Sequence, residues 1–539
     1  MRLQSVQIGT ASFSCETCES GRSGNLSWEV ENSEGRFVLR LRSDGETELR
    51  CVRARFAFPF EKHDMLYLNG YQSWTDSRER GVRGKMRSLD RVPKKLLERY
   101  CFDRYGDYRF VRYGKKPGQQ HGFSYGYVRR GGEFTLLGSL AEESGFTVLR
   151  FDTNDNTVTL EKDCRGHRFT GDYTVFELVI LRGAEDAVFD EYFRLLRIPP
   201  AKGRRLTGYT SWYNLYENIS EASIAADLRG FADAEKKPDV FQIDDGYENA
   251  VGDWLIPNER FPRGMKAAAD QIRAAGMLPG IWLAPFTAEK KSLLAKEHPD
   301  WLLRDESGEP QPGGCNWSGF YGLDIYNPEV RAYLKRVFDT VIRDWGYGLV
   351  KLDFLYCACL IPRRDRTRAQ VMYDGMRLLR ELCGDALILG CGVPLVPAFG
   401  LVDYCRIGCD MTLNWAGEFR MRFFHRESAS TRNTILNTVF RRHLDGRAFR
   451  NDPDVFLLRD DNMKLSLRQR ETLATVNALF GGVLFTSDNV GQYDDAKRAA
   501  YRRIEALDRS CVTAVRATPD RLTVRCRSGK KKHRLTVSM

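Results

Sequence analysis

The chain has 539 residues, of which 42% are hydrophobic, 29% charged and 12% aromatic. This composition is typical of a globular protein with a large core, and it excludes disordered and fibrous classes. The formal net charge of +11 comes from basic residues scattered along the chain, and the one tight basic run, 530–534, falls in an expected terminal turn. Because nucleic-acid-binding proteins carry an extended basic stripe, we expect no nucleic-acid partner.

Cysteine spacing and the length of apolar runs indicate which cellular compartment and which cofactors to expect. No apolar run reaches the roughly 18 residues of a membrane span, so we expect no membrane partner. Residues 1–13 contain no apolar region of secretory length. The 14 cysteines include one C-x-x-C, Cys15 and Cys18, and no second pair at zinc-site spacing. We therefore expect no metal, no cofactor and a reducing, cytoplasmic compartment, and we leave a homo-oligomer open.

The first 195 residues or so have the pattern of an antiparallel β-domain of sandwich type. Short apolar runs alternate with Gly, Asp and Asn turns. A helical segment at 184–196 then leads to the Pro- and Gly-containing stretch 198–205, which is the expected domain boundary. The β-runs are 36–42, 53–60, 134–140, 156–163 and 173–181.

After the boundary, eight strand-like apolar runs recur with helical stretches such as 219–234 and 327–345 between them. This rhythm predicts a closed parallel (β/α)₈ barrel. The gap between the fifth and sixth runs is too short for a full helix, and short β-runs return after a last helix at 494–507. The eight runs are 205–214, 239–247, 278–286, 348–356, 386–395, 402–411, 451–458 and 481–489.

Polar side chains fall late in these runs, where barrel enzymes carry their chemistry. Lys351 and Asp353 project from the same face of one run, because strand side chains alternate. Taken singly, each such residue could be a turn, a helix cap or a core aromatic. Their joint placement favours a functional site. They are Asp244, Asp245, Trp282, Lys351, Asp353, Arg406, Asp410, Asp452, Asp454 and Asp488.

The residue types favour carboxylate chemistry on a sugar. No serine lies in a G-x-S-x-G elbow, the histidines avoid the strand ends, and GCG at 390–392 lacks a Walker lysine. Two carboxylates facing each other are the minimum equipment for glycoside hydrolysis. Trp282, Trp212 and Trp74 could stack on sugar rings, although core packing explains Trp212 and Trp74 equally well.

Nine ordered motifs now resemble one known family. Over 420 residues the chain is similar to glycoside hydrolase family 36, the α-galactosidases (melibiases) and their raffinose-synthase relatives. The motifs are GYQSW (70–74), QIDDGYE (242–248), GIWLAPF (280–286), HPDWLLRDESGEP (298–310), LDIYNPEV (323–330), KLDFLY (351–356), GCGVPL with GLVDYCRIGCD (390–410), NDPD (451–454) and FTSDN (485–489).

The resemblance implies a multidomain α/β architecture. It comprises an N-terminal antiparallel β-supersandwich (1–198), a central catalytic (β/α)₈ TIM barrel (199–508) and a small C-terminal β-domain (509–539). It also implies roles, with Asp353 as nucleophile and Asp410 as acid/base. The family's sugar contacts carry over residue by residue: Asp244 and Asp245 to the O4 and O6 hydroxyls, Lys351 to the O3 and O4 side, Arg406 to the 2-hydroxyl, Trp282 to the pocket wall and Trp74 to the barrel mouth.

The function that the resemblance implies is a retaining exo-α-galactosidase acting on oligosaccharides. Three alternatives stay open: a transglycosidase of the raffinose-synthase kind, a hydrolase of another α-sugar such as an α-N-acetylgalactosaminide, and a non-catalytic sugar-binding protein. Retention of both Asp353 and Asp410 argues against the last. The chain departs from the family pattern near the pocket, with Cys409 in a proline position and Val455 in a cysteine position. We also expect the ammonium of Lys351 to favour the ionised form of Asp353.

Overall fold

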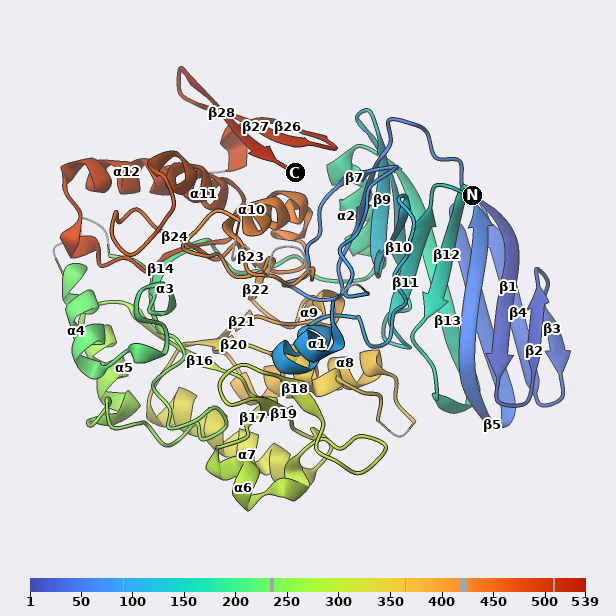
Figure 1. Cartoon of the computed structure of the whole chain (residues 1–539), viewed down its shortest axis with the longest axis horizontal. Coiled ribbons are helices and arrows are strands. Elements are labelled where there is room, and N and C mark those ends of the chain that lie inside the picture. Colours follow the sequence, from blue (N-terminus) through green and yellow to red (C-terminus); the bar gives the residue numbers. More distant parts are fainter. Residues whose placement is uncertain (91, 233–236, 364, 417–424, 508) are drawn as a thin grey trace.

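The computed structural model describes residues 1–90, 92–232, 237–363, 365–416, 425–507 and 509–539. A β-rich N-terminal part lies beside a helix-covered barrel, and a small sheet near the C-terminus lies against both (Figure 1). No helix among the described residues is long and apolar enough to cross a membrane. Residue 508, at the end of the predicted barrel domain, lies outside the described residues, and the division at 198 and 508 stays a prediction.

The N-terminal part is a 13-stranded antiparallel assembly. Its longest strand, β5 (Arg36–Ala57), joins two predicted runs, 36–42 and 53–60, that looked separate because Asp44-Gly45 reads as a turn. The first half of β5 pairs with β13 and β4, and its second half with β1 and β12, so one strand serves both layers. The other strands are β1 (Arg2–Thr10), β2 (Ser14–Thr17), β3 (Gly21–Ser23), β4 (Leu26–Ser33), β6 (Met65–Leu68), β7 (Arg80–Gly81), β8 (Gln119–Phe123), β9 (Tyr125–Arg130), β10 (Glu133–Ser139), β11 (Thr147–Asp152), β12 (Thr157–Lys162) and β13 (Arg168–Gly183).

The second sheet closes into the predicted barrel. Its strand order begins with β23 (Arg450–Asp452) and ends with β24 (Val455–Phe456), which are two parts of one chain segment. Because β23 pairs with β22 and β24 with β25, this segment closes the sheet. All eight predicted runs therefore contain a barrel strand. The others are β14 (Leu206–Thr210), β15 (Val240–Ile243), β16 (Leu278–Leu283), β20 (Leu349–Leu352), β21 (Leu387–Gly390), β22 (Tyr404–Arg406) and β25 (Val483–Thr486).

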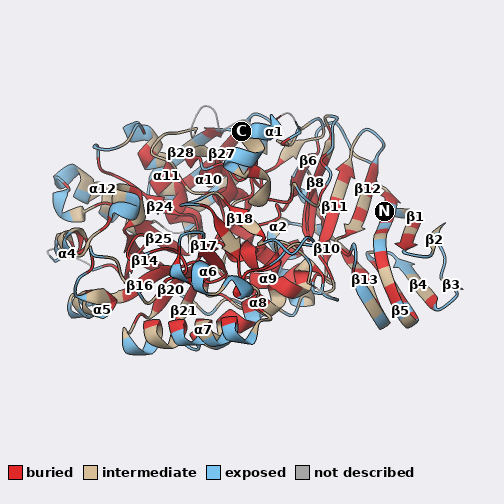
Figure 2. Cartoon of the chain, turned by 60° about the horizontal axis from the view of Figure 1, so that its bottom comes forward, coloured by how far each residue is buried: buried red, intermediate tan, exposed pale blue. Residues whose placement is uncertain are grey.

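Helices cover the barrel, buried toward the strands and exposed outward (Figure 2). Only the short α9 (Leu395–Ala398) separates β21 from β22, as the short gap predicted. The predicted helix 327–345 is α7 followed by a π-helical segment, Asp339–Asp344. The main helices are α2 (Glu185–Leu195), α4 (Glu221–Gly230), α5 (Gly264–Ala274), α7 (Pro328–Phe338), α8 (Arg368–Cys383), α10 (Thr431–Phe440), α11 (Leu467–Phe480) and α12 (Asp495–Glu505).

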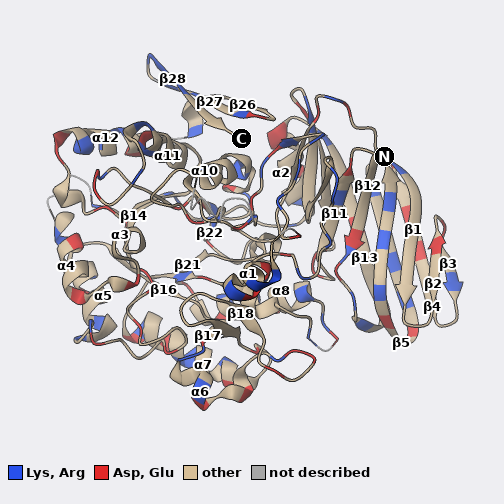
Figure 3. Ribbon diagram, viewed as in Figure 1, with Lys and Arg blue, Asp and Glu red and all other residues tan. Residues whose placement is uncertain are grey.

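Shorter elements complete the fold. Lys and Arg are spread over all parts of the molecule (Figure 3). The basic run 530–534, expected in a terminal turn, begins at the turn of a terminal hairpin and continues along its second strand. That hairpin belongs to the sheet of β26 (Val512–Thr518), β27 (Arg521–Ser528) and β28 (Lys531–Ser538). The chain between β16 and β20 forms another small sheet. It consists of β17 (Thr287–Glu289), β18 (Pro312–Gly314) and β19 (Phe320–Gly322), and the short helices are α1 (Lys94–Tyr100), α3 (Trp212–Leu215) and α6 (Leu293–Glu297).

One loop of the N-terminal part docks on the barrel and brings Trp74 to its mouth. The backbone N–H of Ser73 donates to the Val393 carbonyl at 2.9 Å. The fully buried guanidinium of Arg441, just after α10, donates to the Ser73 carbonyl at 2.6 Å and to Asn69 Oδ1 at 3.1 Å. These bonds give the buried guanidinium hydrogen-bond partners and fix the loop at the same time.

Candidate functional site

Lys351 and Asp353, which the sequence places on the same face of one strand, both lie among charged partners in the barrel. Lys351 lies in β20 and donates from Nζ to Asp244 Oδ2 at 2.9 Å. Asp244 follows β15 and also accepts hydrogen bonds from Gln242 Nε2 at 2.7 Å and Thr210 Oγ1 at 3.1 Å. Burial opposes the charge of Lys351, but the carboxylates of Asp244 and Asp353 outweigh it and raise the pKa of the ammonium. The strand therefore carries a permanent cation into the barrel mouth.

Asp353 follows Lys351 on the same face, one residue beyond the end of β20. Its Oδ2 accepts from Trp282 Nε1 at 3.2 Å and its Oδ1 from the backbone N–H of Phe354 at 2.8 Å. Burial raises the pKa of Asp353; Lys351 lowers it, and the charge of Asp410 raises it further. The ammonium thus acts in the direction expected from the sequence, but burial is the larger influence and the net shift is upward.

The turn after Asp353 shapes one wall of the site. Phe354 has a left-handed backbone, with φ 52°, and Gly392 packs against it. A Cβ at Gly392 would lie 3.0 Å from the Phe354 nitrogen and 2.9 Å from Trp74 Cζ2, so only glycine fits. The indole of Trp74 packs edge-on against Phe354, at 5.1 Å between ring centroids, and its Nε1 donates to Cys391 Sγ at 3.3 Å. Trp74 thus lies at the barrel mouth, where we expected it.

Arg406, at the end of β22, joins three carboxylates. Its guanidinium contacts Asp410 Oδ1 at 2.7 Å, Asp452 Oδ2 at 2.9 Å and Asp454 Oδ1 at 3.0 Å. Asp410 is 46% exposed, whereas the other two carboxylates are buried. The fork geometry of arginine makes it suited to such a cluster.

Asp454 interrupts the seventh strand and is the most unusual acid of this cluster. It has a left-handed backbone, with φ 75°. Its Oδ2 accepts from the hydroxyl of Tyr213 and from the backbone N–H of Met411 at 2.8 Å. Burial raises the pKa of Asp454 to about 7, against the charge of Arg406. Sequence reasoning marked this residue as a strand-end acid but gave it no role.

Asp245 lies beside Asp244 and faces an aromatic residue that sequence reasoning missed. Its Oδ2 accepts from Trp317 Nε1 at 2.9 Å. Burial, reinforced by the neighbouring Glu248, raises the pKa of Asp245 well above its usual range. Trp317 comes from the segment between β18 and β19 and packs 6.1 Å from Trp282 between ring centroids. It is not on a barrel strand, so the strand-end rule could not find it.

Trp212 is the predicted residue least connected to the others. It begins α3, is half-buried, and packs edge-on against Tyr216 at 5.2 Å between ring centroids. Burial raises the pKa of Tyr216, and the charges of Asp410 and Asp454 also contribute. Trp212 therefore contacts Tyr216, whose hydroxyl is influenced by the charges of Asp410 and Asp454. In the described part of the chain it makes no hydrogen bond or ring contact with another predicted site residue.

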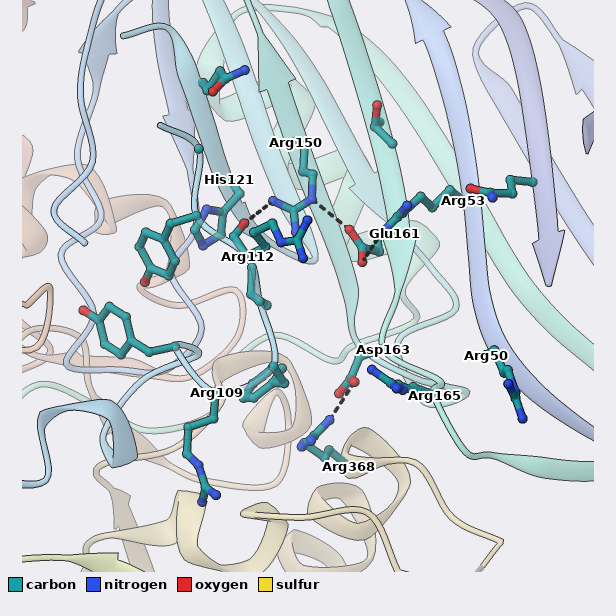
Figure 4. Close-up of a pocket in the computed structure, with 18 of the residues that line it drawn as sticks. Arg50, Arg53, Arg109, Arg112, His121, Arg150, Glu161, Asp163, Arg165 and Arg368 are labelled. Atoms are coloured by element: carbon teal, nitrogen blue, oxygen red, sulfur yellow. Dashed lines mark hydrogen bonds and ion pairs between the residues drawn. The ribbon is translucent and has the colours of Figure 1, made fainter. Parts of the chain in front are cut away.

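The candidate site does not coincide with the larger of two cavities in the described part of the chain. The cavity lined by Lys351, Arg406 and Asp454 among others has a volume of only about 10 Å³. A cleft of about 1990 Å³ lies instead between the N-terminal sheet and the barrel (Figure 4). Arginines project into it, paired in places with acids such as Glu161 and Asp163, and no predicted site residue lines it.

The chemistry of the strand ends favours displacement at a carbon atom by carboxylates. One acid, Asp353, is buried and rigidly held, and a second, Asp410, is half exposed beside a guanidinium. Several converging polar groups with shifted pKa values are the usual mark of an active site. Carboxylates, an ammonium, a guanidinium and indole rings are also the groups that bind a sugar's hydroxyls and its apolar face.

Comparison with known proteins points the same way. Residues 210–370 match the family model described as Melibiase. The model spans β14 to the start of α8, which includes Asp244, Trp282, Lys351 and Asp353. The match supports the resemblance to the melibiases of glycoside hydrolase family 36.

Curated proteins to which this chain is similar include an α-galactosidase 1 of Pediococcus pentosaceus. It is 25% identical over 169 residues, which are 29% of this chain and 22% of that protein. The matched stretches cover between 18% and 25% of the first four curated relatives. A solved α-galactosidase from Thermus thermophilus, in complex with p-nitrophenyl α-D-galactopyranoside, is 29% identical, with a TM-score of 0.73, over 94% of this chain and 98% of that one. Its complex with stachyose is 28% identical, with a TM-score of 0.70, over 93% and 99%.

Proposed function

We propose that this protein is a retaining exo-α-galactosidase that removes terminal α-D-galactosyl groups from oligosaccharides. The observation that carries the proposal is the pair of acids at the barrel mouth in contrasting settings. Asp353 is buried and held by Trp282 and a backbone N–H. Asp410 is 46% exposed and touches Arg406. A retaining glycosidase needs one fixed nucleophile and one acid/base that reaches the leaving group and water.

In this proposal the reaction has two displacements. A carboxylate oxygen of Asp353 attacks the anomeric carbon while Asp410 gives its proton to the glycosidic oxygen, so a bond to Asp353 forms as the bond to the leaving group breaks. Asp410 then takes a proton from water, which attacks the same carbon and releases Asp353. Two inversions give the α-anomer of galactose. The family's two acids are expected about 5 to 5.5 Å apart for this stereochemistry.

The surrounding residues are proposed to hold the sugar. By family resemblance, Asp244 and Asp245 receive the O4 and O6 hydroxyls, Lys351 the O3 and O4 side, and Arg406 the 2-hydroxyl. The Lys351–Asp244 contact of 2.9 Å supports a shared site for the first group. Trp282 and Trp74 form walls, and we add Trp317, because its indole bonds Asp245 and packs near Trp282.

The proposal also includes a cellular compartment and two alternative activities. All 14 cysteines lie among the described residues and each is free, which suits a reducing, cytoplasmic compartment. Because Cys409 stands beside Asp410 in a proline position of the family, transfer to a sugar acceptor and cleavage of an α-N-acetylgalactosaminide are kept as outcomes of the test below.

The decisive experiment measures hydrolysis of a panel of aryl α- and β-glycosides by the wild type and Asp353→Asn. Proton NMR identifies the anomer that forms first. We expect release from the α-galactoside as the α-anomer, abolished in the variant. A first-formed β-anomer would overturn the retaining mechanism. Turnover only with an added sugar acceptor would identify a transglycosidase, and sugar binding without turnover under either condition would refute catalysis.

A further inference from the structure

Two cysteines from distant parts of the chain meet beside the candidate site. Cys101 ends α1 in the N-terminal part and has a left-handed backbone, with φ 49°. Cys315 lies between β18 and β19, in the segment that connects barrel strands β16 and β20. Its Sγ donates to the carbonyl oxygen of Tyr100, the residue before Cys101, at 2.9 Å, so the two cysteines are neighbours in the folded chain. Both residues are partly exposed.

The same short segment reaches the proposed sugar pocket. The hydroxyl of Tyr105 accepts from the Cys315 backbone N–H at 3.0 Å and donates to Asn316 Oδ1 at 2.5 Å. Trp317 comes next and donates from its indole to Asp245. Cys315 is therefore two residues from a side chain that touches the pocket, and Tyr105 links it to the N-terminal part.

The setting of Cys315 is that of a reactive thiol. Reactivity follows the thiolate fraction and access to solvent. The neighbouring Cys101 side chain is the largest influence on the Cys315 thiol; it outweighs burial and lowers the pKa of Cys315 to about 6. In contrast, burial raises the pKa of Cys391 and Cys357 near the pocket. Those two thiols lack both requirements.

We propose that Cys315 is a site of reversible oxidation by hydroperoxides and that Cys101 is its resolving thiol. In the first step the Cys315 thiolate attacks one peroxide oxygen, the O–O bond breaks, and the departing oxygen takes a proton to leave as water or an alcohol. Sulfur is oxidised to a sulfenic acid as the peroxide is reduced. The Cys101 sulfur then attacks the sulfenic sulfur, and hydroxide takes the thiol's proton and leaves as water.

The product is a disulfide that ties the α1 turn to the segment bearing Trp317. A dithiol reductant restores both thiols by exchange through a mixed disulfide. Because the Cys315 sulfur already lies against the backbone next to Cys101, we expect little backbone movement when this bond forms. The inference concerns thiol chemistry and stands apart from the proposed hydrolysis.

The test treats the full chain with hydrogen peroxide and maps disulfides by mass spectrometry of non-reduced peptides. We expect the Cys101–Cys315 linked peptide to form first and to disappear with dithiothreitol. In Cys101→Ser, dimedone should trap a sulfenic acid at Cys315, whereas the control Cys18→Ser should form the linked peptide as the wild type does. Earlier formation of a Cys15–Cys18 disulfide, or indiscriminate oxidation, would overturn the proposal.

A second measurement needs no variant. The rate at which iodoacetamide alkylates each cysteine of the wild type is followed against pH, with Cys18 as the exposed reference. We expect alkylation of Cys315 to be half-maximal near pH 6, several-fold faster than Cys18 at that pH. A profile at Cys315 that rises with that of Cys18 would overturn the proposal. Because neither readout uses glycoside turnover, failure here is distinguishable from failure of the proposed function.

Discussion

The two halves of the candidate site are built differently. The Asp353 half rests on consecutive barrel strands, and its acid is buried, bonded by an indole and a backbone N–H, and flanked by the Lys351–Asp244 pair. The Asp410 half lies beyond the end of β22, and its acid is half exposed and held by one guanidinium contact. A nucleophile needs a fixed position, whereas an acid/base must serve both a leaving group and water. The roles that we propose for the two acids rest on this contrast more than on the presence of two acids.

The largest test of this contrast removes the buried acid. We expect Asp353→Ala to lower kcat/KM at least about a thousandfold for every leaving group, because the covalent step is lost. Azide, which can enter the vacated space, should restore turnover and give a β-galactosyl azide, which NMR detects. The matched control Asp155→Ala alters an exposed acid of the large cleft and should leave kcat/KM unchanged. Equal losses in both variants, or an α-azide, would contradict the assignment.

Removing the exposed acid should discriminate between leaving groups. For Asp410→Ala we expect kcat/KM to fall by about a hundredfold or more on a trisaccharide, since its departing alkoxide needs a proton. On a nitrophenyl galactoside the loss should be less than about tenfold, because nitrophenolate leaves without one. Steady-state kinetics on both substrates make the comparison. A uniform loss would show that Asp410 has no role as the proton donor.

The Lys351–Asp244 pair tests how far the rigid half depends on buried charge. Lys351→Met leaves a buried carboxylate without its cation, so we expect the free energy of unfolding to fall by about 3–5 kcal/mol. The control Arg53→Met breaks a half-exposed ion pair with Glu161 in the large cleft and should cost less than about 1 kcal/mol. Urea unfolding followed by circular dichroism measures both. If both variants lost similar amounts of unfolding free energy, the buried ion pair of the site would be no more important for stability than the half-exposed pair of the large cleft.

The sequence predicted the Asp353 half of the site better than the Asp410 half. Lys351 and Asp353 lie on a strand, where alternation fixes the facing of side chains, and their common direction followed from spacing alone. The eight barrel runs were found for a different reason, since buried parallel strands are continuous apolar stretches. Asp410 was also marked as a polar residue late in its run, but its role as acid/base came from the family resemblance, because nothing in a loop's local pattern fixes the direction of a side chain.

What the sequence could not predict comes from contacts between distant segments. Trp317, in the segment between β16 and β20, donates a hydrogen bond from its indole to Asp245. Trp74, in the N-terminal part, donates one from its indole to Cys391 of the barrel. The upward pKa shift of Asp353 likewise depends on how completely neighbours bury it, which spacing does not reveal. In the N-terminal part, the Asp44-Gly45 turn signal was overridden by pairing along the whole of β5.

The smallest test concerns Asp454, which supports the Asp410 half from below. Its pKa, about 7 in the folded protein, is higher than an unfolded aspartate's, so the folded state holds one more proton between about pH 4 and pH 7. Stability from this group is complete below about pH 4, decreases by up to about 1.4 kcal/mol per pH unit as pH rises through that window, and is gone above pH 7. Asp454→Asn cannot titrate, so this slope should disappear. The measurement is urea unfolding of both proteins from pH 4 to 8, with the difference between them plotted. Because the acids common to both proteins cancel in that difference, a flat line would show that Asp454 is ionised throughout and that the Arg406 cluster holds its full negative charge.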